Sequence, residues 1–503
     1  TAFTTKEIIK SVVEHTPSKF PDRFYRALTN KVNLIDSTNL VGARGVVVSP
    51  DGKNVYVVAY NSNSIVHWDR DTATGALTNQ VDLIDSINLY GARGVVVSPD
   101  GKNVYVVAYN SNSIVHWDRD SDTGALSNQV NLIDSTNLSS PNSVAVSPDG
   151  KNIYAVASQS DSIVYWDRDS DTGALSNQVN LIDSTHLNKA GGVAVSPDGN
   201  NVYAVAQHSH SIVYWDRDSA TGALTNQVNL RDNYSLKSAV SVVVSPDGKN
   251  VYAVASQSDS IVHWDRDSTT GALSNQVNHQ VNNVDDGWKN NLNGAGNVAV
   301  SPDGKNIFVT AFLSGSIVYW DRDSATGALT NHVDLIDETL YPASVIVSPD
   351  GKNVYAVGFL SDSIVHWDRD TEADISSNLT SYDHWATNFN HVPIVDVIYT
   401  RNHREGLTVE TTETISLAEL LGYCHYHYPN YIGVAPNIRI GSAPDMFKHT
   451  CVESVNNDDN VGIRISQQIY MKIDGNWSTQ YPLCRGCESG KSNNPLVVGQ
   501  CTE

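Results

Sequence analysis

The stretch IVHWDRDTATGALTN, residues Ile65 to Asn79, returns in close copies along most of this 503-residue chain. A second motif, SPDG, keeps the same spacing, and its successive copies begin 49, 49, 49, 49, 56 and 47 residues apart. These copies begin at Ser49, Ser98, Ser147, Ser196, Ser245, Ser301 and Ser348. A period of this length, with short strands and turn signals, is typical of the blades of a β-propeller.

Each repeat contains four strand-like runs, which in the first copy are GVVVSP, NVYVVAY, SIVHWD and LTNQVDLID. Short runs rich in Val, Ile, Tyr and Trp, bounded by Gly, Asn, Asp and Ser, predict the strands of an antiparallel sheet. The Pro50-Asp51-Gly52 that follows the first run predicts a turn, because Pro presets φ and Gly accepts a positive φ. We name these strands A to D, from the axis of the ring outward.

The outermost strand is missing from the seventh copy but is present at the front of the chain. The seventh copy continues past Asp370 as TEADISSN, which has no D-strand pattern, whereas RALTNKVNLIDS, Arg26 to Ser37, has that pattern. If this first strand completes the last blade, the ring leaves no open sheet edge. The sequence therefore predicts an all-β fold, a seven-bladed propeller of four-stranded blades closed by an N-terminal strand.

The combination of SPDGKNVYV and IVHWDRDTATGALT resembles the seven-bladed lactonase-type β-propellers, also called YVTN-repeat propellers. The resemblance extends from about Arg26 to Asp370 and implies the ring fold. It implies two kinds of function, because this family includes 6-phosphogluconolactonase-like enzymes alongside surface proteins with no known reaction. No catalytic residue of the enzymes falls on a matching motif, so the resemblance assigns none.

Three parts are expected along the chain. Residues 1–25 form an N-terminal segment, in which the apolar residues have helical spacing and predict a short helix. Residues 26–370 form the propeller. Residues 371–503 lose the repeats and contain all the cysteines, which predicts a small, mostly β C-terminal domain with one short helix.

The charge balance excludes two classes of partner. Lys and Arg total 33 against 55 Asp and Glu, a formal net charge of -22. Nucleic acids and anionic membranes both require basic patches, so neither is expected as a partner. No apolar run approaches the length of a transmembrane helix, and we expect no membrane span.

Several features favour an extracellular protein. The chain begins at Thr1 without Met, which fits removal of a signal peptide. Four sequons offer glycosylation candidates at Asn137, Asn233, Asn378 and Asn476. The disulfide candidates are Cys424, Cys451, Cys484, Cys487 and Cys501. In an exported chain two disulfides are favoured over the alternative, a zinc site that combines some of these cysteines with neighbouring histidines.

Strand direction assigns the loops to two faces of the ring. If the A strands run from top to bottom, the D–A and B–C loops lie on the top face and the SPDGKN and DRDTATG turns on the bottom face. The bottom turns are nearly identical in all copies, whereas the top loops differ, so a ligand site is expected at the top. The same directions place the attachment of residues 1–25 and 371–503 at the bottom face, where we expect the two segments to pack together.

The residues that open the B–C loops divide the top face into two arcs. They are, in copy order, Tyr60, Tyr109, Ser158, Gln207, Ser256, Phe312 and Phe359. Because the ring closes, the four aromatic residues are neighbours, and Arg44 and Arg93, five residues before their SPDG serines, fall on the same arc. Guanidinium groups beside aromatic faces suit a sugar or planar group with a carboxylate. The alternative is that these aromatic residues only close the channel mouth by packing.

Two further features concern ligands. The top loop from His279 to Gly296 belongs to the 56-residue repeat and holds Trp288, and extra loop length on a rigid scaffold often serves binding. The DRDSDTG turns cluster carboxylates as a calcium loop does, but the third acid is absent from other copies, and Asp turn chemistry accounts for them. We expect no metal and no cofactor.

Two functions remain open. The first is an extracellular, non-enzymatic propeller that binds a glycan or protein partner, or assembles with copies of itself, through its top face. Near-identical blades favour this function, because they offer repeated weak contacts but few unique acid–base groups. The second is a lactonase-like hydrolase with Arg44 and Arg93 at the channel mouth, whose catalytic residues the sequence leaves unknown.

Overall fold

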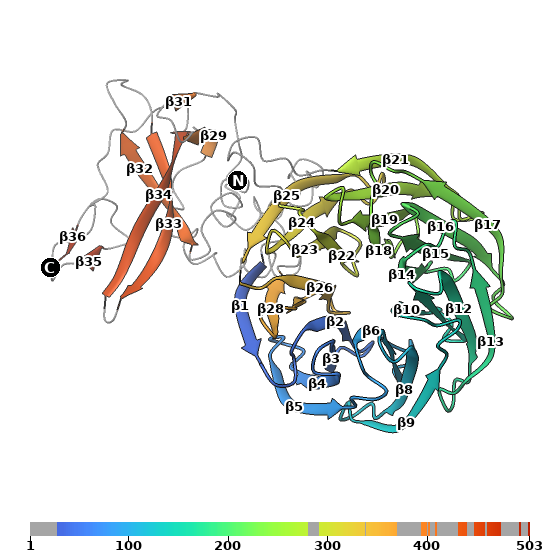
Figure 1. Ribbon diagram of the computed structural model, residues 1–503. Coiled ribbons are helices and arrows are strands. Elements are labelled where there is room, and N and C mark those ends of the chain that lie inside the picture. Colours follow the sequence, from blue (N-terminus) through green and yellow to red (C-terminus); the bar gives the residue numbers. More distant parts are fainter. Residues whose placement is uncertain are drawn as a thin grey trace. The chain divides into compact units, whose positions relative to one another are not determined.

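The computed structural model describes residues 28–279, 291–337 and 339–369, together with the backbone of eight strands between residues 394 and 502. The two predicted helices, Trp288 and the packing of residues 1–25 against 371–503 lie outside the described residues. Asn30–Arg369 forms one compact unit, the ring in Figure 1.

Seven antiparallel four-stranded sheets make up the ring, each with its A strand innermost (Figure 1). Blade 1 consists of β2 (Ala43–Val48), β3 (Asn54–Ala59), β4 (Ser64–Arg70) and β5 (Leu77–Ile84). Blade 2 consists of β6 (Ala92–Val97), β7 (Asn103–Ala108), β8 (Ser113–Arg119) and β9 (Leu126–Ile133). Blade 3 consists of β10 (Pro141–Val146), β11 (Asn152–Ala157), β12 (Ser162–Arg168) and β13 (Leu175–Ile182). Blade 4 consists of β14 (Ala190–Val195), β15 (Asn201–Ala206), β16 (Ser211–Arg217) and β17 (Leu224–Arg231).

The remaining blades follow the same plan, except for the origin of the last D strand. Blade 5 consists of β18 (Ala239–Val244), β19 (Asn250–Ala255), β20 (Ser260–Arg266) and β21 (Leu273–His279). Blade 6 consists of β22 (Ala295–Val300), β23 (Asn306–Ala311), β24 (Ser316–Arg322) and β25 (Leu329–Ile336). Blade 7 consists of β26 (Pro342–Val347), β27 (Asn353–Gly358), β28 (Ser363–Arg369) and β1 (Leu28–Ile35). The predicted closure by an N-terminal strand is confirmed.

Side chains reinforce this closure at both edges of β1. The Nδ2 of Asn30 donates to the carboxylate of Asp368 in β28 at 2.7 Å. On the other side, the ammonium group of Lys31 pairs with the carboxylate of Asp337 in blade 6. Lys31 stands where Gln80 stands in blade 1, and the Nε2 of Gln80 donates to Asp36 at 2.6 Å. An ion pair thus replaces a neutral amide contact at the junction that closes the ring.

Lys31→Gln tests the value of this ion pair. Because the Lys31 side chain is 42% exposed, we expect its loss to change the free energy of unfolding by at most about 1 kcal/mol. Urea unfolding at low and high salt checks this expectation. High salt screens the ion pair, so it should lower the free energy of unfolding slightly in the parent protein and not in the variant. A loss of several kcal/mol in the variant would show that closure depends on the ion pair rather than on strand pairing.

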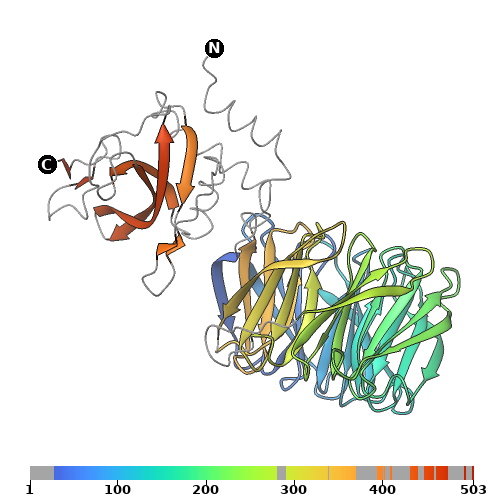
Figure 2. The same cartoon turned by 90° about the horizontal axis from the view of Figure 1, so that it is seen from above.

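The two faces of the ring are built as predicted, and Figure 2 shows the disc edge-on. At the bottom, the A–B and C–D turns meet, since Nη1 of Arg70 at the end of a C strand donates to the carbonyl of Gly52 at 2.9 Å. At the top, the B–C and D–A loops meet, since the hydroxyl of Ser62 donates to the carbonyl of Asn39 at 2.7 Å. The last C strand, β28, ends at Arg369 on the bottom face, where Nη1 of Arg369 bonds the carbonyl of Gly351.

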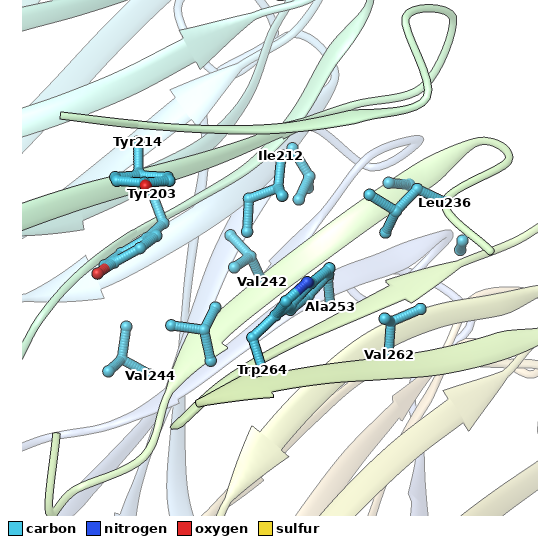
Figure 3. Close-up of a cluster of buried hydrophobic side chains, with 13 residues drawn as sticks. Tyr203, Ile212, Tyr214, Leu236, Val242, Val244, Ala253, Val262 and Trp264 are labelled. Carbon is cyan, nitrogen blue, oxygen red and sulfur yellow. The ribbon is translucent and has the colours of Figure 1, made fainter. Parts of the chain in front are cut away.

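The apolar core of the ring lies between blades. In Figure 3, Tyr203 and Ile212 of blade 4 pack against Val242, Ala253 and Trp264 of blade 5. The B strands are buried along their whole length, which explains why these runs are apolar on both faces. Each blade therefore folds as a layer of a stack rather than as an independent sheet.

A buried arginine at the end of each C strand joins its blade to the preceding one. In blade 3, Nε of Arg168 donates to the hydroxyl of Tyr105 at 2.9 Å, and Nη2 donates to both carboxylate oxygens of Asp100 at 2.9 and 3.0 Å. Nη2 also bonds Oδ1 of Asn103, and Nη1 bonds the carbonyl of Gly150 within blade 3. The same set of contacts recurs at Arg70, Arg119, Arg217, Arg266 and Arg322.

The junction of blades 6 and 7 departs from this pattern for a physical reason. Elsewhere the tyrosine hydroxyl also donates to a glycine carbonyl in the next C–D turn, as Tyr105 does to Gly173 at 2.7 Å. The seventh repeat lacks that TG turn, and the tyrosine is replaced by Phe308. A phenylalanine avoids a buried hydroxyl without its usual acceptor. Nε of Arg369 bonds Oδ1 of Asn306 instead, at 3.1 Å.

A separate four-stranded antiparallel sheet lies in the C-terminal part of the chain. It consists of β29 (Ile394–Tyr399), β34 (Asn460–Ile473), β33 (Phe447–Asn457) and β32 (Tyr431–Arg439), in this order. The short strand pairs are β30 (Arg401–Asn402) with β31 (Thr408–Val409), and β35 (Ser492–Asn493) with β36 (Cys501–Thr502). The predicted disulfides lie outside what the structure describes, because it describes no side chain here.

Candidate ligand site at the top of the axial strands

A bulge in every A strand displaces the position that carries Arg44 and Arg93. In blade 1, Ala43 pairs with Ala59 and Gly45 with Val58, so Arg44 has no partner in the register. The same shift occurs in all seven blades. The bulged residues are Arg44, Arg93, Asn142, Gly191, Val240, Gly296 and Ala343. A bulge changes the direction of a side chain relative to the regular alternation along the strand, and bulges are frequent beside functional sites.

Arg93 is fixed between two aromatic rings. Its guanidinium carbon lies 3.8 Å from the ring centroid of Tyr109 and 5.1 Å from that of Tyr60. Its Nη1 donates to Oδ1 of Asn142, the bulged residue of the next blade. The hydroxyl of Tyr60 is held in turn by the side-chain amide of Asn110, whose Nδ2 donates to it at 3.1 Å. Arg93 is therefore rigidly positioned by blades 1, 2 and 3.

Arg44 is held less completely than Arg93. Its guanidinium carbon lies 4.9 Å from the ring centroid of Phe359 in the neighbouring blade 7. Phe359 meets Phe312 edge to face, with centroids 6.1 Å apart, and Phe312 contacts Tyr341 at 5.6 Å. The four aromatic residues predicted to be neighbours are thus brought together with both arginines across blades 6, 7, 1 and 2.

Neither guanidinium group has a carboxylate partner among the residues that the structure describes. The arginine at the end of each C strand is paired with an aspartate, whereas no ion pair within the described ranges involves Arg44 or Arg93 of the A strands. The Nε atoms of both are buried without a hydrogen-bond partner within the described part of the chain. A buried donor that is charged and unpaired is costly, so it favours an acceptor supplied from outside.

The pKa directions agree with this arrangement. Burial, followed by the nearby positive charge of Arg93, lowers the pKa of Arg44 to about 10. Burial also lowers the pKa of Arg93. Both groups remain protonated at neutral pH, so the site carries two adjacent positive charges. Burial acts to raise the pKa of Tyr109, but hydrogen bonds with Ser158 and Ser140 and the charge of Arg93 lower it below its usual value.

The opposite arc of the top face is polar and satisfied internally. The hydroxyl of Ser158 donates to the carbonyl of Ser140 at 3.1 Å, and that of Ser256 donates to the carbonyl of Ser238 at 3.3 Å. Gln207, at the same position in blade 4, is half-buried. The asymmetry that the sequence predicts is therefore present, and the two guanidinium groups lie on the aromatic side.

Sequence reasoning missed Tyr341 as a member of the site. Tyr341 has a φ of 47°, in the left-handed region, at the loop position that Gly42, Gly91 and Gly294 occupy in other repeats. A bulky residue there is strained, and such strain tends to occur at functional sites. An alignment of the repeats contains the signal, because the other six repeats have glycine, serine or lysine at this position and the seventh has an aromatic residue.

Two of the four glycosylation candidates lie in the described part of the chain. Asn137 is half-buried, and its Nδ2 donates to Asp134 at 2.9 Å, as Asn39 and Asn88 do to the equivalent aspartates. The exposed Asn233 has only an acceptor contact, from Nε of Arg231. Glycosylation stays a prediction at both residues, and the amide of Asn137 also bonds within its turn. Asn378 and Asn476 lie outside the described residues.

The structure of the C–D turns agrees with turn chemistry. Oδ1 of Asp120 accepts the backbone amides of Asp122 and Thr123 at 3.0 and 2.8 Å. Among the described residues, no group of three or more His, Cys, Asp or Glu is arranged to hold a metal ion. Within those same ranges there is also no helix with the length and apolarity needed to span a membrane.

Several solved structures resemble the ring. One is the hydrazine synthase of Kuenenia stuttgartiensis (18% identity, TM-score 0.51, covering 67% of this chain and 97% of that one). Another is the WD40 repeats of RRP9 (12% identity, TM-score 0.52, covering 68% and 99%). A "putative 6-phosphogluconolactonase" from Bacteroides uniformis matches at 20% identity, with a TM-score of 0.47, over 58% and 84%. At these identities the likeness concerns the fold alone.

A search among curated proteins gives no significant match. The family model described as "Lactonase, 7-bladed beta-propeller" matches residues 23–187, 134–244, 178–285 and 242–383. These overlapping matches cover the whole ring, including the N-terminal strand that closes it. The chain therefore belongs to the lactonase family of seven-bladed β-propellers.

Proposed function

We propose that this propeller is a non-enzymatic binding protein whose top face takes an anionic group of its partner at Arg44 and Arg93. The observation that carries the proposal is the pair of guanidinium groups that have no carboxylate partner in the part of the chain that the structure describes, while the whole chain has a net charge of -22. We further propose an extracellular location, supported by the sequons and by the cysteines confined to the C-terminal part.

The geometry favours a carboxylate or another planar anion. Arg93 packs between the rings of Tyr60 and Tyr109, so its side chain loses little conformational entropy when a ligand binds. Arg44 contacts one ring only, and its Nε has no partner within the described residues. A carboxylate placed there would gain charge-assisted hydrogen bonds, and it would offset the repulsion between the two positive charges.

Benzoate and its neutral analogue benzamide test this function by calorimetry or NMR titration of the full chain. We expect benzoate to bind more tightly, and Arg44→Ala to weaken its binding about tenfold or more, because a hydrogen bond to a charged group contributes about 1.5–3 kcal/mol. Ser256→Ala, at the loop position on the opposite arc, is the control and should leave binding unchanged. Equal affinity for the two compounds contradicts the proposal.

A lactonase-like hydrolase is the second candidate, and the lowered pKa of Tyr109 beside Arg93 favours it. Ring opening of a lactone produces a carboxylate that Arg44 could bind, and tyrosine is one of the side chains that act as general acids or bases. The seven bulged residues include no Asp, Glu or His that could act as a second general acid or base. If the chain hydrolyses a lactone and Tyr109→Phe abolishes the reaction while benzoate still binds, the enzymatic function replaces the binding one.

A further inference from the structure

Exposed apolar residues lie beside Arg44 on the side of blades 6 and 7. Leu313 and Leu360, in the B–C loops of blades 6 and 7, are 64% and 57% exposed. Each directly follows one of the aromatic residues that extend from Arg44, namely Phe312 and Phe359. We call Phe312, Leu313, Tyr341, Phe359 and Leu360 the blade 6–7 patch.

The patch is a local departure from the repeat. The residues at the position of Leu313 and Leu360 in blades 1 to 5 are Asn61, Asn110, Gln159, His208 and Gln257. All five are polar, so neither the fold nor blade packing requires a leucine there. Large apolar side chains exposed together beside polar neighbours mark interaction sites in soluble proteins.

Tyr341 gives a second, independent indication at the same place. Its ring packs on Phe312, and its backbone has a φ of 47° where other blades use glycine, serine or lysine. The strain disfavours an aromatic residue at this position, and one ring contact with Phe312 does not by itself explain why Tyr is present. Such strain is expected where a side chain serves recognition rather than folding.

The composition of the site distinguishes between classes of partner. Tyr, Phe and Arg are the residues enriched at protein–protein interfaces, and Tyr and Arg are frequent where the binding energy is concentrated. A saccharide stacks on flat aromatic faces, whereas the exposed leucines are flexible and offer it no hydrogen bond. The chain leaves the ring at Arg369 on the bottom face, away from the patch.

We propose that the partner is a protein segment in which an acidic side chain is flanked by large apolar side chains. The carboxylate pairs with Arg44 and Arg93, and the apolar side chains cover the blade 6–7 patch. This inference rests on the anion-binding function proposed above and adds the class of partner. It predicts that affinity depends on both the charge and the apolar side chains of the segment.

Panning of a phage-displayed random heptapeptide library against the full chain tests the inference. We expect selected peptides to carry Asp or Glu within two residues of Phe, Leu or Trp. Replacing the acid by its amide in a synthetic consensus peptide should weaken binding at least tenfold. Leu313→Ser combined with Leu360→Ser should weaken it at least fivefold without changing the melting temperature, since both side chains are largely exposed.

Gln257→Ser, at the equivalent position of blade 5, is the matched control and should leave peptide binding unchanged. Selection of no consensus, or of one without an acid, overturns the inference. So does Arg44-dependent binding of an acidic glycan that is insensitive to the two leucine substitutions. If benzoate still binds in these cases, only the class of partner is wrong. If benzoate binding also fails, the anion-binding function is wrong as well.

Discussion

Arg168→Ala is expected to lower the free energy of unfolding by about 3 kcal/mol, with a clear fall in the melting temperature. The Arg168 side chain is almost fully buried, and it bonds Tyr105, Asp100 and Asn103 of the preceding blade. Removing one partner of a buried pair costs about 3–5 kcal/mol, because the other polar groups are left without partners. The Asp100 side chain is 31% exposed and can regain water, which places the expected loss at the lower end.

Two controls separate this effect from a general sensitivity to mutation. Tyr105→Phe removes one hydroxyl but keeps the Arg168–Asp100 pair, so it should cost less, about 1–2 kcal/mol. Arg231→Ala removes an exposed arginine from the outer strand β17 and should have almost no effect. Urea unfolding measures all three. If Arg168→Ala costs no more than Arg231→Ala, the arginine contacts do not join the blades.

His263→Tyr is expected to remove part of the loss of stability that acid causes in this protein, to which other buried histidines also contribute. His263 is buried in β20, and its Nδ1 lies 3.0 Å from Nε2 of His279. Burial and the proximity of His279, opposed by Asp265, lower the pKa of His263 to about 4. The charge of Arg322 in the next blade acts in the same lowering direction.

The sign of the pH dependence follows from the lowered pKa. In the unfolded chain a histidine takes up its proton near pH 6.5, whereas His263 in the folded chain stays neutral down to about pH 4. The unfolded state therefore binds more protons between these values, and stability falls as the pH is lowered through this window. At 1.36 kcal/mol per pKa unit, the loss due to His263 is about 3 kcal/mol at pH 4.

Other blades of the ring supply matched variants for this prediction. Blades 3, 4 and 6 have Tyr165, Tyr214 and Tyr319 at the position of His263, so tyrosine fits the packing. His263→Tyr should flatten the curve of unfolding free energy between pH 6.5 and 4, and Tyr214→His should steepen it. The same slope in the parent and both variants would show that these buried positions do not control acid stability.

The blades and their closure could be predicted from the sequence because the determinants are local. Pro50-Asp51-Gly52 forms its turn wherever it occurs, and the alternation of short β-branched runs with such turns defines four strands in each repeat. The missing D strand after Asp370 and the extra one from Arg26 to Ser37 predicted the pairing of β1 with β28. Their pairing needs no knowledge of side-chain contacts.

Part of the candidate site also follows from the sequence. Once the ring is closed, blades 6, 7, 1 and 2 must be neighbours, so Phe312, Phe359, Tyr60 and Tyr109 must share an arc with the two arginines. The bulge that displaces Arg44 and Arg93 does not follow, because nothing in ARGVVV distinguishes a bulged strand from a regular one. The strained backbone of Tyr341 was likewise missed, since its φ is imposed by a loop that the other repeats build with glycine, serine or lysine.

Only the tertiary structure decided which charges are paired. Arg168 finds its carboxylate in Asp100, 68 residues away, and Arg70 finds Asp350, 280 residues away, whereas Arg44 and Arg93 find none among the described residues. The paired arginines end the WDR motif of the C strands, and Arg44 and Arg93 stand in ARGVVV, but neither motif shows which carboxylate lies within reach. The difference arises because an ion pair depends on distances between blades, while strands and turns depend on neighbours along the chain.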